Sequence, residues 1–132
     1  MIGLDTNLLL RSILDDDREQ FLRATKYIAA HCSAAEPGFV NRIVVCELAW
    51  TLERSYRISR ETIADAMAGL LASVDLTIED AEEIRGLLPA YRAGTVGFVD
   101  LLLARLNLRQ GCSATAAFDR KAARIEGFVR VS

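Results

Sequence analysis

The sequence has 132 residues, of which 52% are hydrophobic and 26% are charged. This composition predicts one folded domain with a hydrophobic core, and it excludes a disordered or fibrous chain. The formal net charge of -2 does not decide for or against a nucleic-acid partner. Fourteen of the 16 basic residues are arginine, and if four carboxylates bind metal, 14 acidic residues remain against those 16.

Membrane insertion and export are not expected from this sequence. No apolar run approaches the ~20 residues of a membrane helix, and no basic segment with a cleavage site indicates a secretory signal. Cys32, Cys46 and Cys112 lie far apart and form no CxxC motif, which predicts core cysteines in a reducing cytoplasm. His31 is the only histidine. This argues against zinc chemistry and excludes a Ser-His-Asp triad unless His31 is its base.

The first eleven residues contain two apolar runs separated by Asp5, Thr6 and Asn7. The first run is too short for a helix and predicts a buried strand that ends at Asp5. In parallel α/β sheets, ligands bind at this carboxyl edge, and an unpaired carboxylate between apolar runs would be costly to desolvate. The alternative is that Asp5 or Asn7 only caps the following helix.

Helices and strands then alternate along the chain. Asp15 to Asp17 predict a solvated turn, and Asp17 with Gln20 predicts a helix start. Thr77 and Asp80 predict a cap, with Glu79, Asp80, Glu82 and Glu83 as a solvated first helical turn. The expected helices are Leu8 to Leu14, Asp17 to about Cys32, Ile43 to Tyr56, one opened by Ser59, one closed by Leu88-Pro89 and Arg92 to Gly94, Phe98 to about Gln110, and a short one after Asp119. The expected strands are the N-terminal run, Gly38 to Asn41, Val74 to Thr77, Cys112 to Phe118 and Phe128 to Arg130.

Three further carboxylates stand in unusual positions. Glu47 lies in an apolar helix among Ile43, Val44 and Trp50, which favours a site residue over a stray glutamate that reaches water. Asp100 interrupts an apolar run near the start of another helix. Asp119 ends a strand as Asp5 does, although it could equally be the cap of the last helix.

Together, these patterns predict a three-layer α/β/α fold with a central parallel sheet of four to five strands, forming a single domain over residues 1–132. Asp5 and Asp119 would then meet at one sheet edge, with Asp100 nearby. Converging carboxylates without His or Cys suit Mg²⁺ or Mn²⁺. Such a metal would activate a water and stabilise charge in phosphoester hydrolysis.

The sequence resembles the PIN-domain family over essentially its whole length, and within that family it is most similar to VapC-type toxins of type II toxin–antitoxin modules. The resemblance rests on Leu4-Asp5-Thr6-Asn7, Glu47, Phe98-Val99-Asp100, Phe118-Asp119-Arg120 and Gly127-Phe128-Val129. It implies an endoribonuclease that depends on Mg²⁺ or Mn²⁺ and hydrolyses RNA phosphodiester bonds. It also implies a homodimer in the cytoplasm that a cognate VapB-type antitoxin neutralises with a peptide placed near the acidic site.

The resemblance assigns roles to five residues. Asp5, Glu47, Asp100 and Asp119 match the catalytic acidic quartet. Asp5, Asp100 and Asp119 would be the metal ligands, Glu47 a further ligand or a water-orienting group, and Asn7 a supporting polar residue. Two positions depart from the family pattern, because Gly97 and Ala117 stand where many relatives have Asp and Thr or Ser. These departures affect the hydrogen bonds that surround the metal ligands, and they leave the acidic quartet intact.

Two other functions are compatible with the sequence. One is an aspartyl-nucleophile phosphatase, which would normally have Asp where Asn7 stands. The other is a non-catalytic binding module, which the cost of an unused acidic cluster disfavours. Candidate phosphate contacts are Arg11, Arg42, Arg92, Arg105 and Arg120, and the helices Arg18 to Cys32 and Ser59 to Ala72 have surplus apolar residues that would suit an apolar partner segment.

Overall fold

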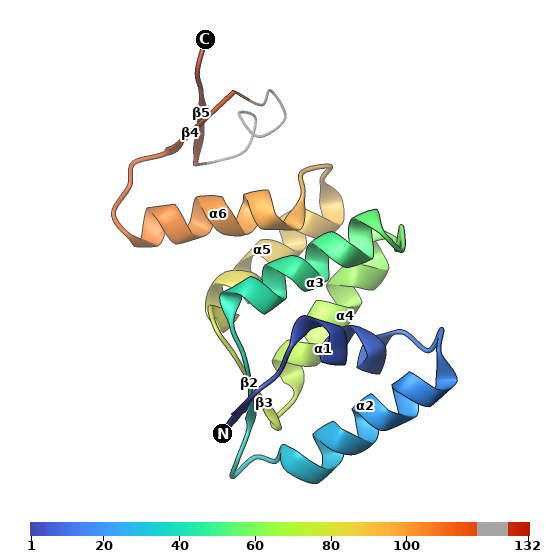
Figure 1. Cartoon of the computed structure of the whole chain (residues 1–132). Coiled ribbons are helices and arrows are strands. Elements are labelled where there is room, and N and C mark those ends of the chain that lie inside the picture. Colours follow the sequence, from blue (N-terminus) through green and yellow to red (C-terminus); the bar gives the residue numbers. More distant parts are fainter. Residues whose placement is uncertain (119–126) are drawn as a thin grey trace. The chain divides into compact units, whose positions relative to one another are not determined.

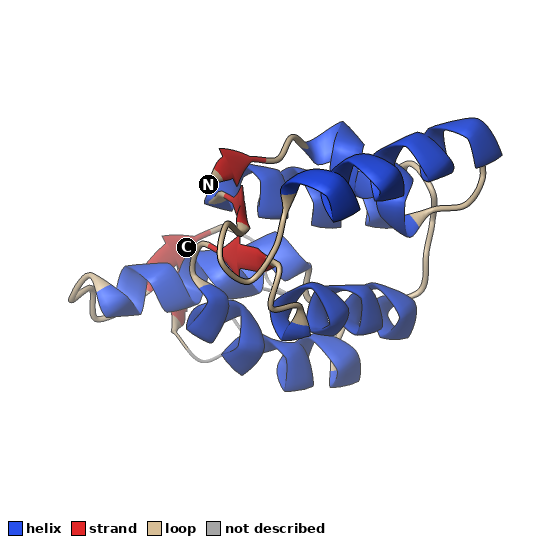
Figure 2. Cartoon of the chain, turned by 90° about the horizontal axis from the view of Figure 1, so that it is seen from below, coloured by secondary structure: helices blue, strands red, loops and turns tan. Residues whose placement is uncertain are grey.

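The structure is a computed structural model that describes residues 1–118 and 127–132. It consists of two compact units, Met1–Ala81 and Glu82–Ser132, and most of their elements are labelled in Figure 1. Each unit contains helices together with short parallel strands, and the helices account for most of the ordered backbone (Figure 2). This arrangement confirms the predicted α/β class.

The first unit is built on a parallel sheet of three strands in the order β1-β2-β3. Gly3 of β1 pairs with Phe39 of β2, and Phe39 pairs with Thr77 of β3. The carboxyl ends of the three strands therefore meet at one edge. The elements of this unit are β1 (Ile2–Gly3), α1 (Thr6–Ile13), α2 (Arg18–His31), β2 (Gly38–Val40), α3 (Arg42–Arg54), α4 (Arg60–Ala72) and β3 (Leu76–Ile78).

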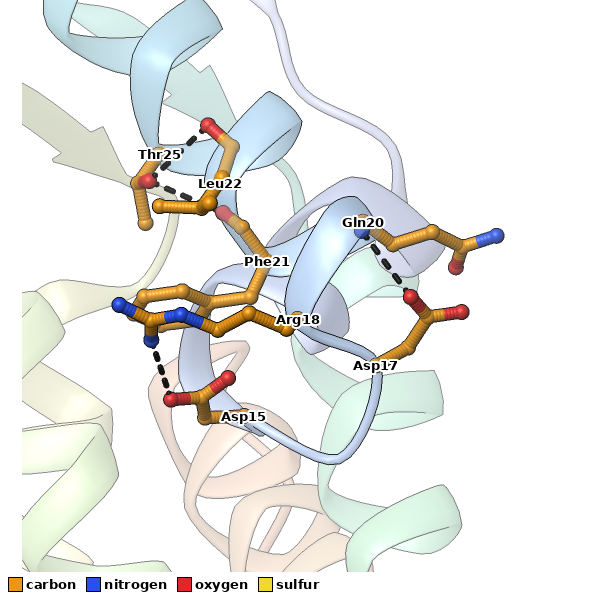
Figure 3. Close-up of polar contacts among 7 residues, drawn as sticks. All are labelled: Asp15, Asp17, Arg18, Gln20, Phe21, Leu22 and Thr25. Atoms are coloured by element: carbon orange, nitrogen blue, oxygen red, sulfur yellow. Dashed lines mark hydrogen bonds and ion pairs between the residues drawn. The ribbon is translucent and has the colours of Figure 1, made fainter.

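Three of these helices begin at a residue whose side chain accepts a backbone N–H bond. Asp17 accepts from the amide of Gln20 at 3.2 Å, as the sequence predicts (Figure 3). Asn41 accepts from Val44 at 3.0 Å, and Ser59 accepts from Thr62 at 3.2 Å. Each bond satisfies an amide that the first helical turn leaves unpaired.

The core of the first unit joins the sheet to α1, α3 and α4. Its most buried side chains include Leu9, Val40, Leu48, Leu52 and Ile63. Gly38 of β2 leaves room for two side chains, because a Cβ there would lie 2.8 Å from both Cys32 Sγ and Leu4 Cδ1, and these would have to shift. Helix α1, which follows β1 directly, packs against α2 and α3.

The second unit contains α5 (Ala81–Ala93, beginning at the boundary), α6 (Phe98–Arg109), β4 (Thr115–Ala117) and β5 (Phe128–Arg130). Strands β4 and β5 pair in parallel. The ring of Tyr91 meets that of Phe98 edge to face, with centroids 5.5 Å apart. Gly111 ends α6 as predicted, with a φ of 99° that suits glycine.

Several sequence expectations need correction. The five strands form sheets of three and two, and each described strand has only two or three residues. Pro89 lies inside α5 and does not end it; the buried side chains of Leu87, Leu88 and Tyr91 around it stabilise the continued helix against the lost N–H bond. Cys112 is exposed and so is not a core residue.

The described helices include none with the length and apolar character needed to cross a membrane. The predicted short helix after Asp119 falls outside the described residues.

Candidate functional site

Asp5 stands where β1 passes into α1, at the carboxyl edge of the three-stranded sheet. Its backbone is extended, with φ -81° and ψ 156°, which places it at the N-cap position of α1. Its side chain accepts no capping hydrogen bond, and no hydrogen bond or ion pair joins it to another described residue. The simple capping explanation therefore does not account for Asp5, and its carboxylate is left available.

A cavity of about 440 Å³ lies between α1 and α2, and Asp5 forms part of its wall. This volume is within the range of small-ligand sites. The polar and aromatic side chains that line the cavity are those of Asp5, Asn7, Arg11, Gln20, Arg23 and Tyr27. The cavity thus joins a free carboxylate to two guanidinium groups and one aromatic ring.

Helix α1 also carries two buried polar atoms that lack a hydrogen-bond partner in the described part of the chain, Thr6 Oγ1 and Arg11 Nε. Arg11 is only weakly engaged elsewhere, because its Nη1 lies 3.3 Å from the nearer oxygen of Asp16. Leaving a buried donor without an acceptor costs about 1–3 kcal/mol. Such an atom calls for an explanation, and a ligand or water that completes the bonding is one.

The other predicted site residues lie elsewhere. Glu47 is an exposed residue of α3 and has no hydrogen bond or ion pair to a described residue. Asp100 is half-buried in the first turn of α6, where a Cβ on Gly97 would lie 3.8 Å from its Oδ2. Asp119 falls outside the described residues. The structure thus brings Asp5 and Asn7 into one cavity, and Glu47 does not line it.

The predicted burial of these carboxylates is wrong for Asp5 and Glu47. Both are exposed. Taken as whole residues, backbone included, none of the described polar or charged residues is buried. Glu47 lies on a solvent-facing side of α3 with Ile43 and Trp50, whose ring contacts the guanidinium of Arg54 at 5.9 Å. Of the apolar neighbours that suggested burial of Glu47, Ile43 and Trp50 are themselves exposed, whereas Val44 is buried. An exposed carboxylate costs little free energy, so desolvation no longer argues against a non-catalytic module.

The neighbouring strand ends carry a second polar cluster, which is fully paired. Arg42, the first residue of α3, donates from Nε and Nη2 to the carboxylate of Asp80 at 2.6 and 3.1 Å. The Asp80 side chain is only 4% exposed. The backbone amide of Arg42 donates to Glu79 Oε1 at 2.6 Å. The prediction of Glu79 and Asp80 as a solvated first turn was wrong, since both bind the start of α3.

Electrostatic shifts around this cluster follow from its contacts. The hydrogen bonds to Asp80 and its negative charge raise the pKa of Arg42, which stays protonated. Burial raises the pKa of the Cys46 thiol one turn further along α3, against the lowering effect of the Arg42 charge. Arg42 is therefore a structural cation, and it is not available as the phosphate contact that the sequence suggested.

A second cavity, of about 420 Å³, lies between α5 and α6 and is largely apolar. Glu83 and Arg105 on its wall already pair with each other, with Arg105 Nε 3.2 Å from Glu83 Oε2. This pairing is of similar length to that of Arg11 with Asp16, so Arg105 stays a predicted phosphate contact. The cavity beside Asp5, with its unpaired groups, is the better candidate site.

The free carboxylates have the chemistry that a hard divalent cation requires. Asp5 and Glu47 offer unpaired oxygen donors, which suit Mg²⁺ or Mn²⁺. Within residues 1–118 and 127–132, however, no three Asp, Glu, His or Cys side chains group closely enough to hold a metal. The described residues therefore provide donors of the right kind and not a complete ligand set.

The first unit is an α/β structure with parallel strands, and Asp5 and Asn7 follow its first strand. Its candidate binding edge is therefore the β1–α1 junction. A family model for the PIN domain matches residues 2–127, nearly the whole chain. The chain belongs to the PIN-domain family, as its sequence motifs predicted. PIN domains are typically metal-dependent nucleases that act on RNA, so membership indicates nuclease activity. A comparison with curated proteins gives no significant match.

Gln20 and Arg23 were missed as site candidates, and Tyr27 was interpreted only as surplus apolar surface. A signal for them exists in the sequence, because Gln20, Arg23 and Tyr27 have the i, i+3, i+7 spacing of one helical face. What the sequence does not reveal is that this face lies along α1, beside Asp5.

Proposed function

We propose that this chain is a VapC-type toxin, a Mg²⁺- or Mn²⁺-dependent endoribonuclease that acts in the cytoplasm. The supporting observation is the free Asp5 carboxylate at the β1–α1 junction, on the wall of a cavity that also holds Arg11 and Arg23. PIN-domain membership supplies the nuclease class. Two cations beside one carboxylate suit a substrate that is itself a polyanion.

Asp5, Asp100 and Asp119 would hold the metal in this proposal, with Glu47 as a further ligand or water-orienting residue. A bound divalent cation would supply Lewis-acid stabilisation of the negative charge on the phosphodiester. Asn7, two residues into α1 and exposed on the same cavity wall, would orient the substrate or a ligand by hydrogen bonding. The arginines would position the RNA backbone.

The test is RNA cleavage by the purified chain with Mg²⁺, with Mn²⁺ and with EDTA. Asp5→Asn, purified in parallel, controls for contaminating nuclease. We expect discrete cleavage products with either metal and none with EDTA or with Asp5→Asn. Cleavage that continues undiminished in EDTA would contradict the metal-dependent mechanism.

A cognate VapB-type antitoxin would restrain the toxin by placing an apolar segment along α2. In support, Ala24 is the only buried residue between Arg18 and His31, whereas Leu22 is 49% exposed. The sequence also suggested α4 for this role, but its apolar stripe of Ile63, Ala64 and Met67 is buried within the first unit. Of the two helices that the sequence suggested, α2 is therefore the better candidate for the partner surface.

Co-expression with the neighbouring small open reading frame tests this partner. We expect a complex on co-purification and relief of growth arrest, and Leu22→Asp should weaken both. Light scattering of the chain alone tests the homodimer that the toxin class implies. Growth arrest that the neighbouring frame does not relieve would defeat the antitoxin assignment.

A further inference from the structure

The cavity between α1 and α2 contains more chemistry than a metal site needs. Asp5 and Asn7 stand at the start of α1, while Arg11 comes from its second half. Helix α2 contributes Gln20, Arg23 and the aromatic ring of Tyr27. Metal ligation explains only Asp5, so the remaining groups indicate a site for part of a larger ligand.

Tyr27 has the features of a stacking platform. Its side chain is partly exposed, at 38%, and its ring lines the cavity. The His31 ring, one turn further along α2, lies 4.2 Å from it at an interplanar angle of 33°. This contact restrains the Tyr27 ring before any ligand binds, which lowers the entropic cost of stacking. Aromatic side chains bind unpaired nucleobases in this manner.

The two arginines have unused capacity for an anion. Arg11 Nε is buried without a partner among the described residues. Its contacts with Asp16, at 3.3 and 3.4 Å, are longer than the 2.7–2.9 Å of strong charge-assisted bonds. Arg23 has no hydrogen bond or ion pair to a described residue. The cavity wall carries these two cations and one carboxylate, Asp5, whereas Asp16, which contacts Arg11, does not line the cavity. A phosphate there would meet Arg23 directly and would compete with Asp16 for Arg11.

We infer that this cavity binds one unpaired nucleotide of the RNA, with the base on Tyr27, the base edge at Gln20 and the phosphate on Arg11 and Arg23. The inference rests on the proposed ribonuclease function and identifies the substrate contacts of that same site. The next phosphodiester along the strand then lies toward Asp5. An apolar peptide fits this wall less well, because it would leave Gln20 and both guanidinium groups unpaired.

Binding of a short randomised, fluorescein-labelled oligoribonucleotide in EDTA tests the inference, because metal-dependent cleavage does not proceed there. We expect Tyr27→Ala to weaken binding roughly 5- to 100-fold and the conservative Tyr27→Phe to restore it. A 2-aminopurine base in the oligonucleotide should be quenched on binding to the wild type and not to Tyr27→Ala.

Arg23→Ala should weaken binding and reduce the slope of log affinity against log salt by about 0.7, the loss of one phosphate contact on a single strand. Arg18→Ala is the matched control on the same helix. Arg18 points to Asp15, 2.5 Å away, and covers the Phe21 ring outside the cavity (Figure 3). Its replacement should leave the salt slope unchanged. Thermal melting confirms that each variant is folded.

RNA binding by Tyr27→Ala and Arg23→Ala with wild-type affinity and salt slope would overturn the inference, even if the chain cleaves RNA. The same result combined with loss of antitoxin binding would assign the cavity to a protein partner and also overturn it. Conversely, Tyr27- and Arg23-dependent binding without any cleavage in Mg²⁺ or Mn²⁺ would support the nucleotide site and defeat the proposed function.

Discussion

At the carboxyl edge of the three-stranded sheet, the polar groups that follow β2 and β3 bind one another, whereas the carboxylate that follows β1 is unpaired. At the β2 and β3 ends, Asn41 caps α3, Glu79 accepts from the Arg42 amide, and Asp80 binds the Arg42 side chain. At the β1 end, Asp5 occupies the same N-cap position and makes no such bond. We call the β2 and β3 side the closed end, because its polar groups bind one another, and the β1 side the open end.

The difference separates structural from functional acidic residues. A carboxylate whose lone pairs are filled by its own protein stabilises the fold, as Asp80 does. A carboxylate that could cap a helix and does not is available for a ligand. Asp5 and the unpaired Thr6 Oγ1 belong to the open end, and the unpaired Arg11 Nε lies further along the same helix, on the wall of the same cavity as Asp5.

The largest expected effect comes from replacing aspartate by asparagine at the open end, with the same replacement at the closed end as the control. Asp5→Asn should lower RNA cleavage at least about 100-fold, because the proposed metal would lose a charged ligand. Its melting temperature should stay close to that of the wild type, since the Asp5 side chain makes no capping bond that the substitution could remove. Initial cleavage rates and thermal melting on the same preparations measure both quantities.

The matched control is Asp80→Asn, which removes the corresponding charge from the closed end. We expect it to keep wild-type cleavage per folded molecule. If Asp80→Asn lost activity as completely as Asp5→Asn while remaining folded, the division of the edge into structural and functional ends would be wrong.

The second effect concerns the two N-caps. Asn41→Ala should destabilise the fold by about 1–2 kcal/mol, because the half-buried Val44 amide loses its acceptor. Asp5→Ala removes no capping bond and forfeits only the interaction with the helix macrodipole, which salt screens. Urea denaturation at high salt should therefore show a clear loss for Asn41→Ala alone. Equal losses would mean that Asp5 does cap α1 in solution.

The third effect compares two Arg–Asp pairs. In the closed end, Asp80 is almost fully covered, although Arg42 is itself largely exposed; in the turn before α2, both Arg18 and Asp15 are exposed. We expect Asp80→Asn to lower the melting temperature by roughly 2–4 °C, and Asp15→Asn to change it by less than about 1 °C. An equally small shift for both variants would show that solvent screens the Asp80 pair as well.

Much of the fold was predictable from the sequence because local signals decide it. Asp17 with Gln20 set the start of α2, and Gly111 set the end of α6, each through the backbone geometry that the residue favours. The order of helices and strands followed from apolar periodicity. Pro89 was misleading, because buried neighbours outweighed the local penalty of proline.

The candidate site was only partly predictable, for a physical reason. Sequence patterns locate residues on faces of elements, and they do not determine which faces meet. Asp5 and Asn7 were found because they follow a strand, whereas Arg23 and Gln20 gain significance only because α2 lies along α1. Glu79 and Asp80 were misassigned because their partner, Arg42, is 37 or more residues away in the chain.

The smallest expected effect lies at the amino-terminal edge of the same sheet, where the α-amino group of Met1 lies 2.7 Å from Glu36 Oε2. The hydrogen bond to this group and its positive charge lower the pKa of Glu36 below its usual range. A lowered folded-state pKa means that the contact stabilises the fold above the unfolded-state pKa, and that this stabilisation is lost as the pH falls through the folded value. Because both groups are exposed, salt should weaken the shift.

An NMR titration of the Glu36 side-chain carboxyl should therefore give a depressed pKa, and acetylation of the amino group should return it to the range of ordinary glutamates. A pKa that acetylation does not change would show that the contact is not formed in solution and that this edge, like the open end of the sheet, leaves its carboxylate unpaired.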